Sequence, residues 1–180
     1  MNDNKTIVAQ QPCLFTEDEL QDFMAFVRAG GEVCDAVLER NVRNAKFLVF
    51  LRQGDCSSGI AALKNPLPSY RQKISKQTGV LVGHSEFPFE LGYIFVLPSA
   101  RHQRISVDLT RAALSAAEGK GVFATSRTNN VYMHATLGKF GFVKSGCVYT
   151  SSKGNHDLQL FLRPAAQPGC AGDTQQAARP

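Results

Sequence analysis

The sequence lacks the features that mark membrane-spanning, secreted and zinc-binding proteins. No apolar run approaches the roughly 20 residues that a membrane helix needs, so we expect no membrane association. The N-terminus, MNDNKTIVAQQ, has no basic region followed by an apolar stretch, which argues against a signal peptide. The five cysteines are odd in number and include no Cys-x-x-Cys pair, which disfavours a disulfide framework and a metal site. We therefore expect a cytoplasmic protein with reduced thiols and no metal.

Strong charge of one sign is also missing. The chain has 20 basic and 15 acidic residues, a net charge of +5, and no long basic block. This small excess suggests an anionic ligand or partner. A basic surface without a binding role explains it equally well.

The chain is long enough for one domain with a sizeable core, because 43% of its 180 residues are hydrophobic. Apolar periodicity predicts helices at 32–43, 105–119, 129–138 and after Thr16, and strands at 5–10, 46–52, 59–64, 90–97, 122–127, 142–150 and 157–163. The order β-α-α-β-β-β-α-β-α-β-β indicates an α/β fold. We expect a mixed, mostly antiparallel central sheet with helices on both faces, in which strand 90–97 is central and buried on both faces.

The ends of this domain follow from composition. We expect residues 1–163 to form a single domain. Residues 164–180 are rich in Pro, Gly, Ala and Gln and have no apolar period, so we expect a disordered tail.

The first helix has a clear start signal. Thr16 is followed three residues later by Glu19, which is the spacing of a capping box. The apolar residues after it follow the helical period i, i+3, i+4, i+7 and are Leu20, Phe23, Met24 and Val27. Gly30-Gly31 ends the helix.

Residues 65–86 interrupt the alternation of strands and helices. They contain Pro66, Pro68 and the basic piece SYRQKISKQTGV, which suits a short helix. We interpret the segment as an insertion that covers part of a site, and a solvated loop remains an equal alternative.

A cluster of basic residues lies where strand 90–97 gives way to the next helix. Pro98 ends strand pairing because it has no N–H to donate, and Arg101, His102 and Arg104 follow it. A helix N-terminus presents unpaired N–H groups and partial positive charge, which together bind phosphate. Arginine side chains can add bidentate hydrogen bonds to phosphate oxygens. The turn therefore predicts a phosphate or pyrophosphate cradle, with solvated arginines as the alternative.

Two segments resemble the GNAT-type N-acetyltransferase superfamily. YIFVLPSARHQRISVDLTRAAL resembles the family's central strand, V-x-P, the acetyl-CoA loop Q/R-x-x-G-x-G/A and the helix after it. NNVYMHATLGKFGFVKSG resembles the family's N-x-x-A-x-x-x-Y-x-K-x-GF segment, with Asn130, Lys139, Gly141 and Phe142 in matching places. The order of elements over residues 5–163 also agrees with the family.

The sequence departs from the family pattern at functional positions. Arg104 and Ser106 occupy the two small positions of the loop, where glycine lets a backbone approach a pyrophosphate closely. Leu137 stands where the family often carries the tyrosine that protonates the departing CoA thiolate.

The resemblance implies acetyl-CoA as co-substrate. Its pantetheine arm would lie between strands 90–97 and 122–127, held by backbone N–H groups near residues 95–97. Asn130 would contact the pantetheine or cap the following helix. The expected cofactor-binding residues are Phe95, Val96, Leu97, Arg101, His102, Gln103, Arg104, Ile105, Ser106 and Asn130.

Two residues are the leading catalytic candidates. Glu90 opens the central strand where several family members carry a catalytic glutamate, and we expect it to act as general base. The alternative is an exposed residue at a strand end. For the acid we expect Tyr132, while Tyr149, Thr136 and Ser126 also carry hydroxyl groups.

The expected activity is transfer of acetyl from acetyl-CoA to a primary amine of a small molecule or peptide by direct attack. Arg71, Lys73 and Lys76 suit an acceptor with an anionic part. Two alternatives remain: a toxin-like enzyme that acetylates aminoacyl-tRNA, and a module that binds acyl-CoA without turnover. Dimerisation is left open.

Overall fold

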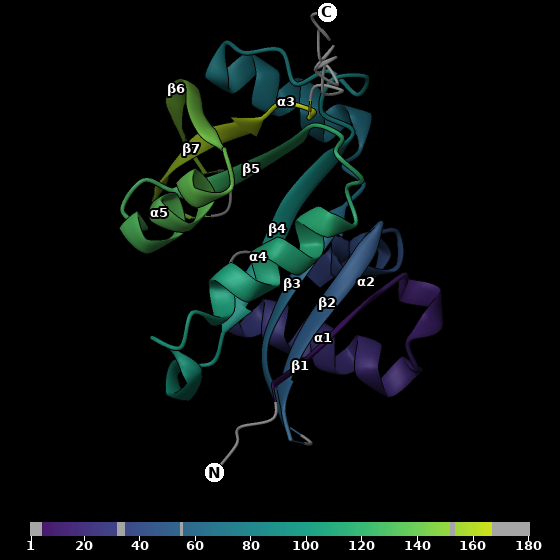
Figure 1. Cartoon of the computed structure of the whole chain (residues 1–180). Coiled ribbons are helices and arrows are strands. Elements are labelled where there is room, and N and C mark those ends of the chain that lie inside the picture. Colours follow the sequence, from purple (N-terminus) through teal and green to yellow (C-terminus); the bar gives the residue numbers. More distant parts are fainter. Residues whose placement is uncertain (1–4, 32–34, 55, 152–153, 167–180) are drawn as a thin grey trace, which may run out of the picture.

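A seven-stranded sheet forms the centre of the molecule (Figure 1). The computed structural model describes residues 5–31, 35–54, 56–151 and 154–166. The strand order is β1-β2-β3-β4-β5-β7-β6, and only β4 and β5 pair in parallel within these ranges. The strands are β1 (Lys5–Gln10), β2 (Phe47–Gln53), β3 (Cys56–Lys64), β4 (Phe89–Val96), β5 (Val122–Arg127), β6 (Val143–Thr150) and β7 (Asp157–Arg163).

Five α-helices accompany the sheet in the described part of the chain: α1 (Glu17–Ala29), α2 (Asp35–Arg43), α3 (Pro68–Thr78), α4 (Ile105–Ser115) and α5 (Val131–Lys139). The expected mixed, mostly antiparallel sheet is confirmed. The order differs from expectation by α3, which lies in the interrupted segment between β3 and β4. The residues 32–34 at the start of the expected second helix, and 167–180 of the expected tail, lie outside the described residues.

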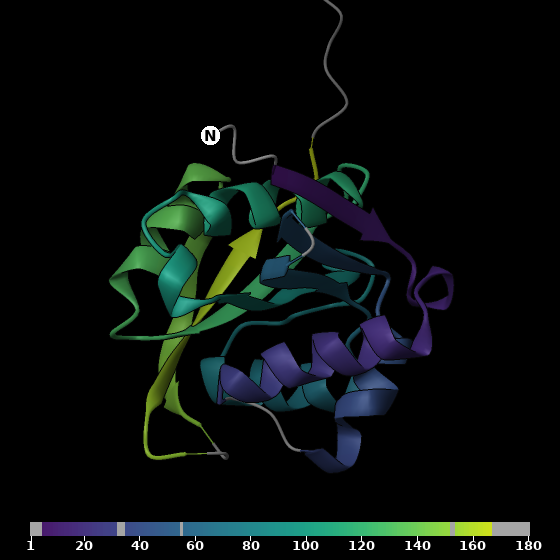
Figure 2. The same ribbon diagram turned by 90° about the horizontal axis from the view of Figure 1, so that it is seen from below.

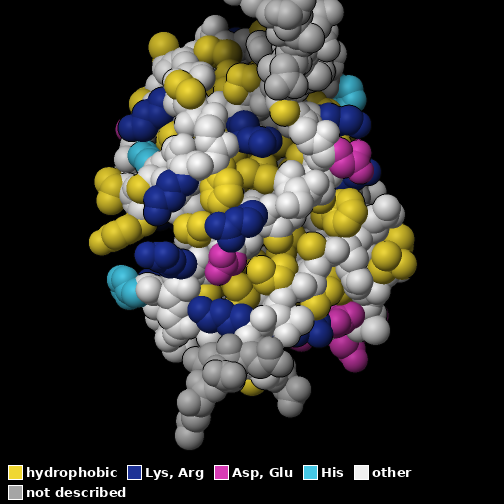
Figure 3. Space-filling model, viewed as in Figure 1, with side chains coloured by type: hydrophobic (Ala, Val, Ile, Leu, Met, Phe, Trp, Pro, Cys, Tyr) yellow, Lys and Arg dark blue, Asp and Glu magenta, His cyan; other side chains and the backbone are white. Residues whose placement is uncertain are grey.

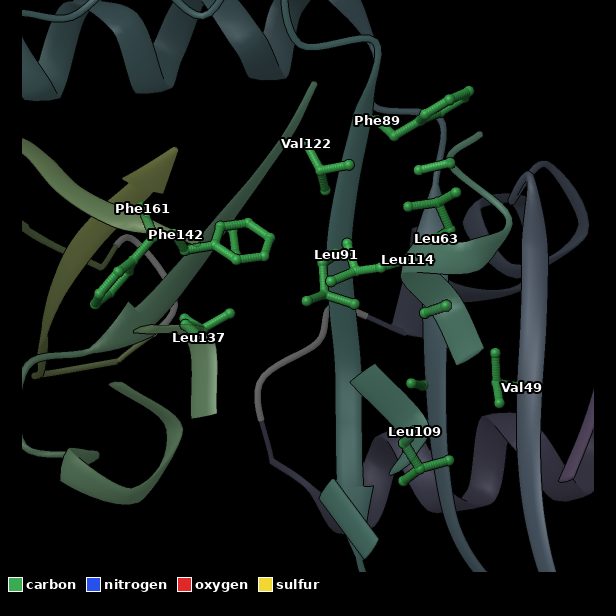
Figure 4. Close-up of a cluster of buried hydrophobic side chains, with 14 of the residues drawn as sticks. Val49, Leu63, Phe89, Leu91, Leu109, Leu114, Val122, Leu137, Phe142 and Phe161 are labelled. Carbon is green, nitrogen blue, oxygen red and sulfur yellow. The ribbon is translucent and has the colours of Figure 1, made fainter. Parts of the chain in front are cut away.

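Strand alternation sends side chains to two separate cores. Val49 and Leu51 of β2 pack beneath α4, whereas Leu48 and Phe50 of the same strand pack beneath α1 and α2. Figure 2 shows the helices on opposite sides of the sheet. The expectation of helices on both faces is confirmed. Figure 4 shows the core on the α4 side.

The third helix, α3, covers the end of the sheet formed by β5 and β7. Its Ile74 packs with Phe123 of β5 and Leu160 of β7. Their neighbours Ala124 and Phe161 point to the α4 side. Alternation therefore places α3 on the same face as α1 and α2. No helix in the described ranges is both long and apolar enough to cross a membrane.

The parallel strands β4 and β5 part almost as soon as they meet. Their register contains only the pairs Phe89–Val122 and Glu90–Phe123. Beyond them β5 continues against β7, and β4 continues against β3. Tyr93 has a φ of 53° at a break in the β3–β4 register, which marks a β-bulge that bends β4.

The divergence changes the burial of β4. Glu90 and Leu91 are buried, but residues 92–96 are only half-buried. The expectation that 90–97 is buried on both faces is therefore wrong for its second half. These apolar residues border an open gap between strands instead of a neighbouring strand.

The capping box of α1 is confirmed. The Glu19 N–H donates to Thr16 Oγ1 over 3.3 Å, and the Thr16 N–H donates to Glu19 Oε2 over 2.9 Å. The four apolar residues predicted for the inner face of this helix are all buried.

We predict that Thr16→Ala lowers the free energy of unfolding by about 1 kcal/mol, because the N–H of the third helical residue loses its acceptor. Urea unfolding measures this as a lower midpoint at constant slope. Thr16→Ser keeps an acceptor oxygen and serves as the control. Equal loss of stability in both variants would contradict the capping contribution.

Candidate functional site

A cleft of about 1190 Å³ opens where β4 and β5 separate. Its lining comes from α1, α2 and α3 on one face of the sheet, from the loop before α4 and from α5 on the other, and from β4 and β5 between them. Lys and Arg side chains are spread among apolar ones on the face that carries α4 (Figure 3). The cleft therefore connects both faces of the sheet through the gap between the strands.

The loop before α4 has the backbone shape that glycine usually provides. His102 has a φ of 67° and Arg104 a φ of 60°, both in the left-handed region. Arg104 is the N-cap of α4 and occupies the family's first glycine position. Arginine in place of glycine therefore changes the side chain at this position, but the backbone stays left-handed.

The first N–H groups of α4 are available to a ligand. Arg104 has no side-chain acceptor, and the first helical bonds run from Val107 and Asp108 to its carbonyl oxygen. In the described part of the chain, no hydrogen bond uses the N–H groups of Ile105 and Ser106. Free N–H groups and the helix dipole attract an anion here.

Most of the expected loop residues line the cleft, and one does not. Arg101, His102 and Arg104 are exposed at its edge, Ile105 is buried beneath it, and Ser106 also lines it.

Gln103 faces away from the cleft, toward the end of β1 and β2. Its side-chain oxygen accepts a hydrogen bond from Gln53 Nε2 over 3.0 Å, and its carbonyl oxygen accepts one from Lys5 Nζ over 3.3 Å. The structure thus gives Gln103 a role in holding the loop against the sheet.

The edge of β4 that faces the gap can be identified from its hydrogen bonds. The Leu97 N–H donates to the Ser58 carbonyl oxygen over 3.0 Å, so it points toward β3. Consecutive N–H groups of a strand point to opposite sides. Phe95 and Leu97 therefore direct theirs to β3, and Val96 directs its N–H into the gap. Phe95 and Val96 line the cleft, but Leu97 does not.

A buried ion pair lies at the end of the cleft where β4 begins. Lys64 Nζ lies 2.8 Å from Glu90 Oε2, and the Tyr70 hydroxyl donates to Glu90 Oε1 over 3.1 Å. Lys64 and Glu90 face each other across β3 and β4. Only 3% of Glu90 is exposed, so the alternative that it is a surface residue is wrong. Its surroundings are not purely apolar, because the Lys64 ammonium group lies beside it.

Electrostatics around this pair keep its neighbours protonated. Burial lowers the pKa of Lys64, but attraction to Glu90 and Tyr93 outweighs burial and the net pKa is raised. Burial, with repulsion from Glu90, raises the pKa of Tyr70 well above its ordinary value. The same causes, burial first, raise the pKa of Tyr149 to about 12. Lys64 is thus charged, and both tyrosines keep their protons at neutral pH.

The residues expected on α5 lie at the outer rim. Tyr132 lines the cleft but is 81% exposed. Asn130 caps α5, since its Oδ1 accepts from the Met133 N–H over 3.1 Å, and it also lines the cleft. Leu137 is buried near Phe142 and Phe161, so an apolar side chain fills the position of the family tyrosine (Figure 4).

The three basic residues expected near the acceptor have different places. Arg71 is buried and donates to the carbonyl oxygens of Phe87 and Pro88, so it holds the chain that leads into β4. Its expected role beside the acceptor is wrong. Lys73 lines the cleft, and Lys76 is exposed outside it.

Sequence reasoning missed Lys64, Tyr70 and Arg40, which also line the cleft. The strand register would have indicated Lys64, because it is the direct neighbour of Glu90. A tight turn would have fixed that register, but more than 20 residues separate β3 from β4.

Within the described ranges, His, Cys, Asp and Glu side chains form no group that could hold a metal ion.

Comparison with known proteins gives structural matches only. No family model matches the chain, and no curated protein matches its sequence. An acyl-CoA N-acyltransferase from Pseudomonas aeruginosa superposes with a TM-score of 0.63 at 15% identity, covering 89% of this chain and 99% of that one. Arabidopsis thaliana NAA60, solved with a bisubstrate analogue, gives a TM-score of 0.62 at 13% identity over 88% and 98%. Salmonella typhimurium yncA, solved with its cofactor acetyl-CoA, gives 0.59 at 13% over 94% and 98%.

The architecture is therefore that of the GNAT-type acetyltransferases, and the resemblance found in two sequence segments is confirmed at the level of the fold. At these identities the matches establish the fold alone.

We predict that Lys64→Met destabilises the protein by about 3–5 kcal/mol, because it leaves the Glu90 carboxylate buried without its cation. The double variant Lys64→Met/Glu90→Gln removes both charges and should recover part of that loss. Denaturant unfolding of the two single variants and the double variant measures the coupling. Additive losses would show that the two side chains do not act as a pair.

Proposed function

We propose that this protein is an N-acetyltransferase that moves an acetyl group from acetyl-CoA to a primary amine of a small molecule or peptide by direct attack. One observation supports this proposal above the others. The glycine-like loop at the start of α4 opens onto the gap between β4 and β5.

The residues of this gap fit acetyl-CoA. The N–H groups of Ile105 and Ser106 suit its diphosphate, and the exposed side chains of Arg101 and Arg104 add positive charge beside them. The open edge of β4, where Val96 directs its N–H, suits the amides of the pantetheine arm. Arg104 keeps the left-handed backbone, so its side chain supplements the backbone contacts instead of replacing them.

The reaction forms one bond and breaks another. The amine nitrogen attacks the thioester carbonyl carbon, the new C–N bond forms, and the C–S bond breaks. The amine gives up a proton and the thiolate gains one. N–H groups on the open edge of β4 are the available donors to the carbonyl oxygen as negative charge develops there.

For the proton leaving the amine, Glu90 remains the proposed base. Its carboxylate borders the cleft at the end where α3 lies and already accepts a hydrogen bond from Tyr70. The buried hydroxyl of Tyr70 stays protonated near neutrality, so it can pass a proton to Glu90 while receiving another.

For the proton gained by the thiolate, the structure favours Tyr149 over Tyr132. Tyr149 lies on β6, lines the cleft and interacts electrostatically with Glu90, and its raised pKa keeps it protonated. Tyr132 is largely surrounded by solvent. A thiolate with an ordinary pKa near 8.5 is also a tolerable leaving group, so water is the alternative proton donor.

Buried Leu137 is the observation that favours a second function, the binding of acyl-CoA without turnover. No arrangement of the described residues favours aminoacyl-tRNA as acceptor or a homodimer, and the proposal does not extend to them.

Two measurements test the proposed function. Acetyl-CoA at 100 times its dissociation constant should stabilise the protein by about 2.7 kcal/mol in thermal unfolding. A panel of primary amines should then release free thiol from acetyl-CoA. Stabilisation without thiol release would indicate the binding module, and no stabilisation would contradict both functions.

The loop before α4 provides a matched pair of variants. Arg104→Gly removes the side chain, and glycine readily keeps the φ of 60°. Acetyl-CoA affinity should therefore fall by about tenfold. Arg104→Val also opposes that backbone conformation, and affinity should fall further. Isothermal titration with acetyl-CoA measures both. Equal affinities of the two variants would contradict a cradle formed by backbone N–H groups.

We predict that Tyr149→Phe lowers kcat by about 10²-fold or more, the usual range for a lost proton donor. Tyr132→Phe should lower it less, because that hydroxyl is exposed. Steady-state kinetics at neutral pH compares the two, with acetyl-CoA affinity measured for each. A larger loss of kcat in Tyr132→Phe would indicate that Tyr132 on α5, and not Tyr149, is the proton donor.

A further inference from the structure

Two residues of the loop before α4 have a backbone conformation that their side chains disfavour. His102 has a φ of 67° and Arg104 a φ of 60°. An L-residue rarely adopts this left-handed region, because its Cβ crowds the following carbonyl oxygen, whereas glycine adopts it readily. Contacts with the rest of the protein must therefore offset the cost of this loop shape.

A chain of hydrogen bonds ties Gln103, the residue between these two, to the antiparallel strands β2 and β3. Gln53, the last residue of β2, donates from Nε2 to Gln103 Oε1 over 3.0 Å. The hydroxyl of Ser58 on β3 donates to Oε1 of the same Gln53 over 2.6 Å, and Ser58 is itself buried. The Gln53 amide is therefore held through its oxygen by the sheet, and it presents its N–H group to the loop at a defined place.

The same part of the sheet also holds the start of the loop. The Leu97 N–H donates to the carbonyl oxygen of Ser58 over 3.0 Å, so Ser58 contacts the loop through its backbone and Gln53 through its side chain. Lys5 of β1 donates from Nζ to the Gln103 carbonyl oxygen over 3.3 Å. None of these five residues lines the cleft, so they can influence a ligand only through the loop that they hold.

We propose that Gln53 and Gln103 are positioning residues for acetyl-CoA, and that their hydrogen bond offsets the cost of the left-handed backbone at His102 and Arg104. The bond holds the loop in the shape that leaves the first N–H groups of α4 available to the ligand. A loop that reaches this shape only part of the time binds with an affinity reduced by that fraction. Arginine can thus replace glycine at position 104 because Gln103 is held from outside the cleft. The inference rests on the proposed binding of acetyl-CoA and adds the residues that shape its site.

Loss of this hydrogen bond should matter more when residue 104 is arginine than when it is glycine. Gln103→Ala should lower acetyl-CoA affinity by about fivefold in the otherwise unaltered protein, the scale of one hydrogen bond. In a chain that carries Arg104→Gly it should lower affinity by about twofold or less, because glycine adopts the positive φ without that support. Isothermal titration with acetyl-CoA measures both ratios. Each ratio compares proteins with the same residue 104, so the loss of the arginine charge cancels.

Two further variants assign the effect to the contact between Gln53 and Gln103. Gln53→Met removes the donor and should lower affinity as much as Gln103→Ala does, and the double variant should lose no more than either single variant. Gln21→Met is the matched control, because Gln21 also makes an exposed side-chain hydrogen bond, to Glu17 over 3.1 Å, but lies on α1. It should bind acetyl-CoA as the unaltered protein does. A general loss of stability would not depend on the identity of residue 104.

The outcomes separate the inference from the proposed function. Equal ratios in the arginine and glycine chains, or unchanged affinity in Gln103→Ala, would overturn the inference while the acetyl-CoA site stands. Absence of acetyl-CoA binding by the unaltered protein would contradict the proposed function. In that case the backbone order of the free protein still decides the inference, because Gln103→Ala should lower the amide NMR order parameter of Arg104 from about 0.85, typical of rigid backbone, to about 0.6 or less. An unchanged order parameter would overturn the inference.

Discussion

The separation of β4 from β5 after two paired residues is the constraint on which the rest of the structure depends. Beyond the gap, β4 remains paired with β3 and β5 remains paired with β7, so each strand keeps the hydrogen bonds along its other edge. The bulge at Tyr93 bends β4, and a 3-10 turn at Pro98–Ala100 and a short loop then lead into α4. An open strand edge and a helix N-terminus therefore border one cleft, and this combination suits a ligand with a diphosphate at one end and amides along its length.

The Lys64–Glu90 pair is the second organising feature, and it joins elements that are distant in the sequence. Lys64 comes from β3, Glu90 from β4 and Tyr70 from α3, and the carboxylate contacts both of the other side chains. A buried carboxylate needs such partners because desolvation strongly disfavours an isolated charge. The pair thus fixes α3 relative to the sheet, and α3 in turn forms part of the wall of the cleft. A structural role for Glu90 and a chemical one are compatible, because its partners also hold the exchangeable protons.

The sequence contained enough local information to predict the sheet, most helices and the loop before α4. Capping at Thr16, alternating burial in β2 and the strand-to-helix turn at Pro98 all depend on neighbours in the chain. Contacts between distant segments were not accessible in this way. The sequence could not show that Arg71 supports the start of β4 or that Leu137 packs in the core. Nor could it show that burial and Glu90 raise the pKa of Tyr149, while Tyr132 is exposed. Arg104 was recognised as a departure, but only the backbone angle shows that the glycine conformation persists.

A crystal structure of the protein with CoA tests the central claim most directly. The account predicts that the diphosphate lies against the N–H groups of Ile105 and Ser106, and that the pantetheine arm runs along the open edge of β4 toward Glu90. A diphosphate bound away from α4, or strands β4 and β5 paired along their whole length with CoA outside the gap, would contradict it.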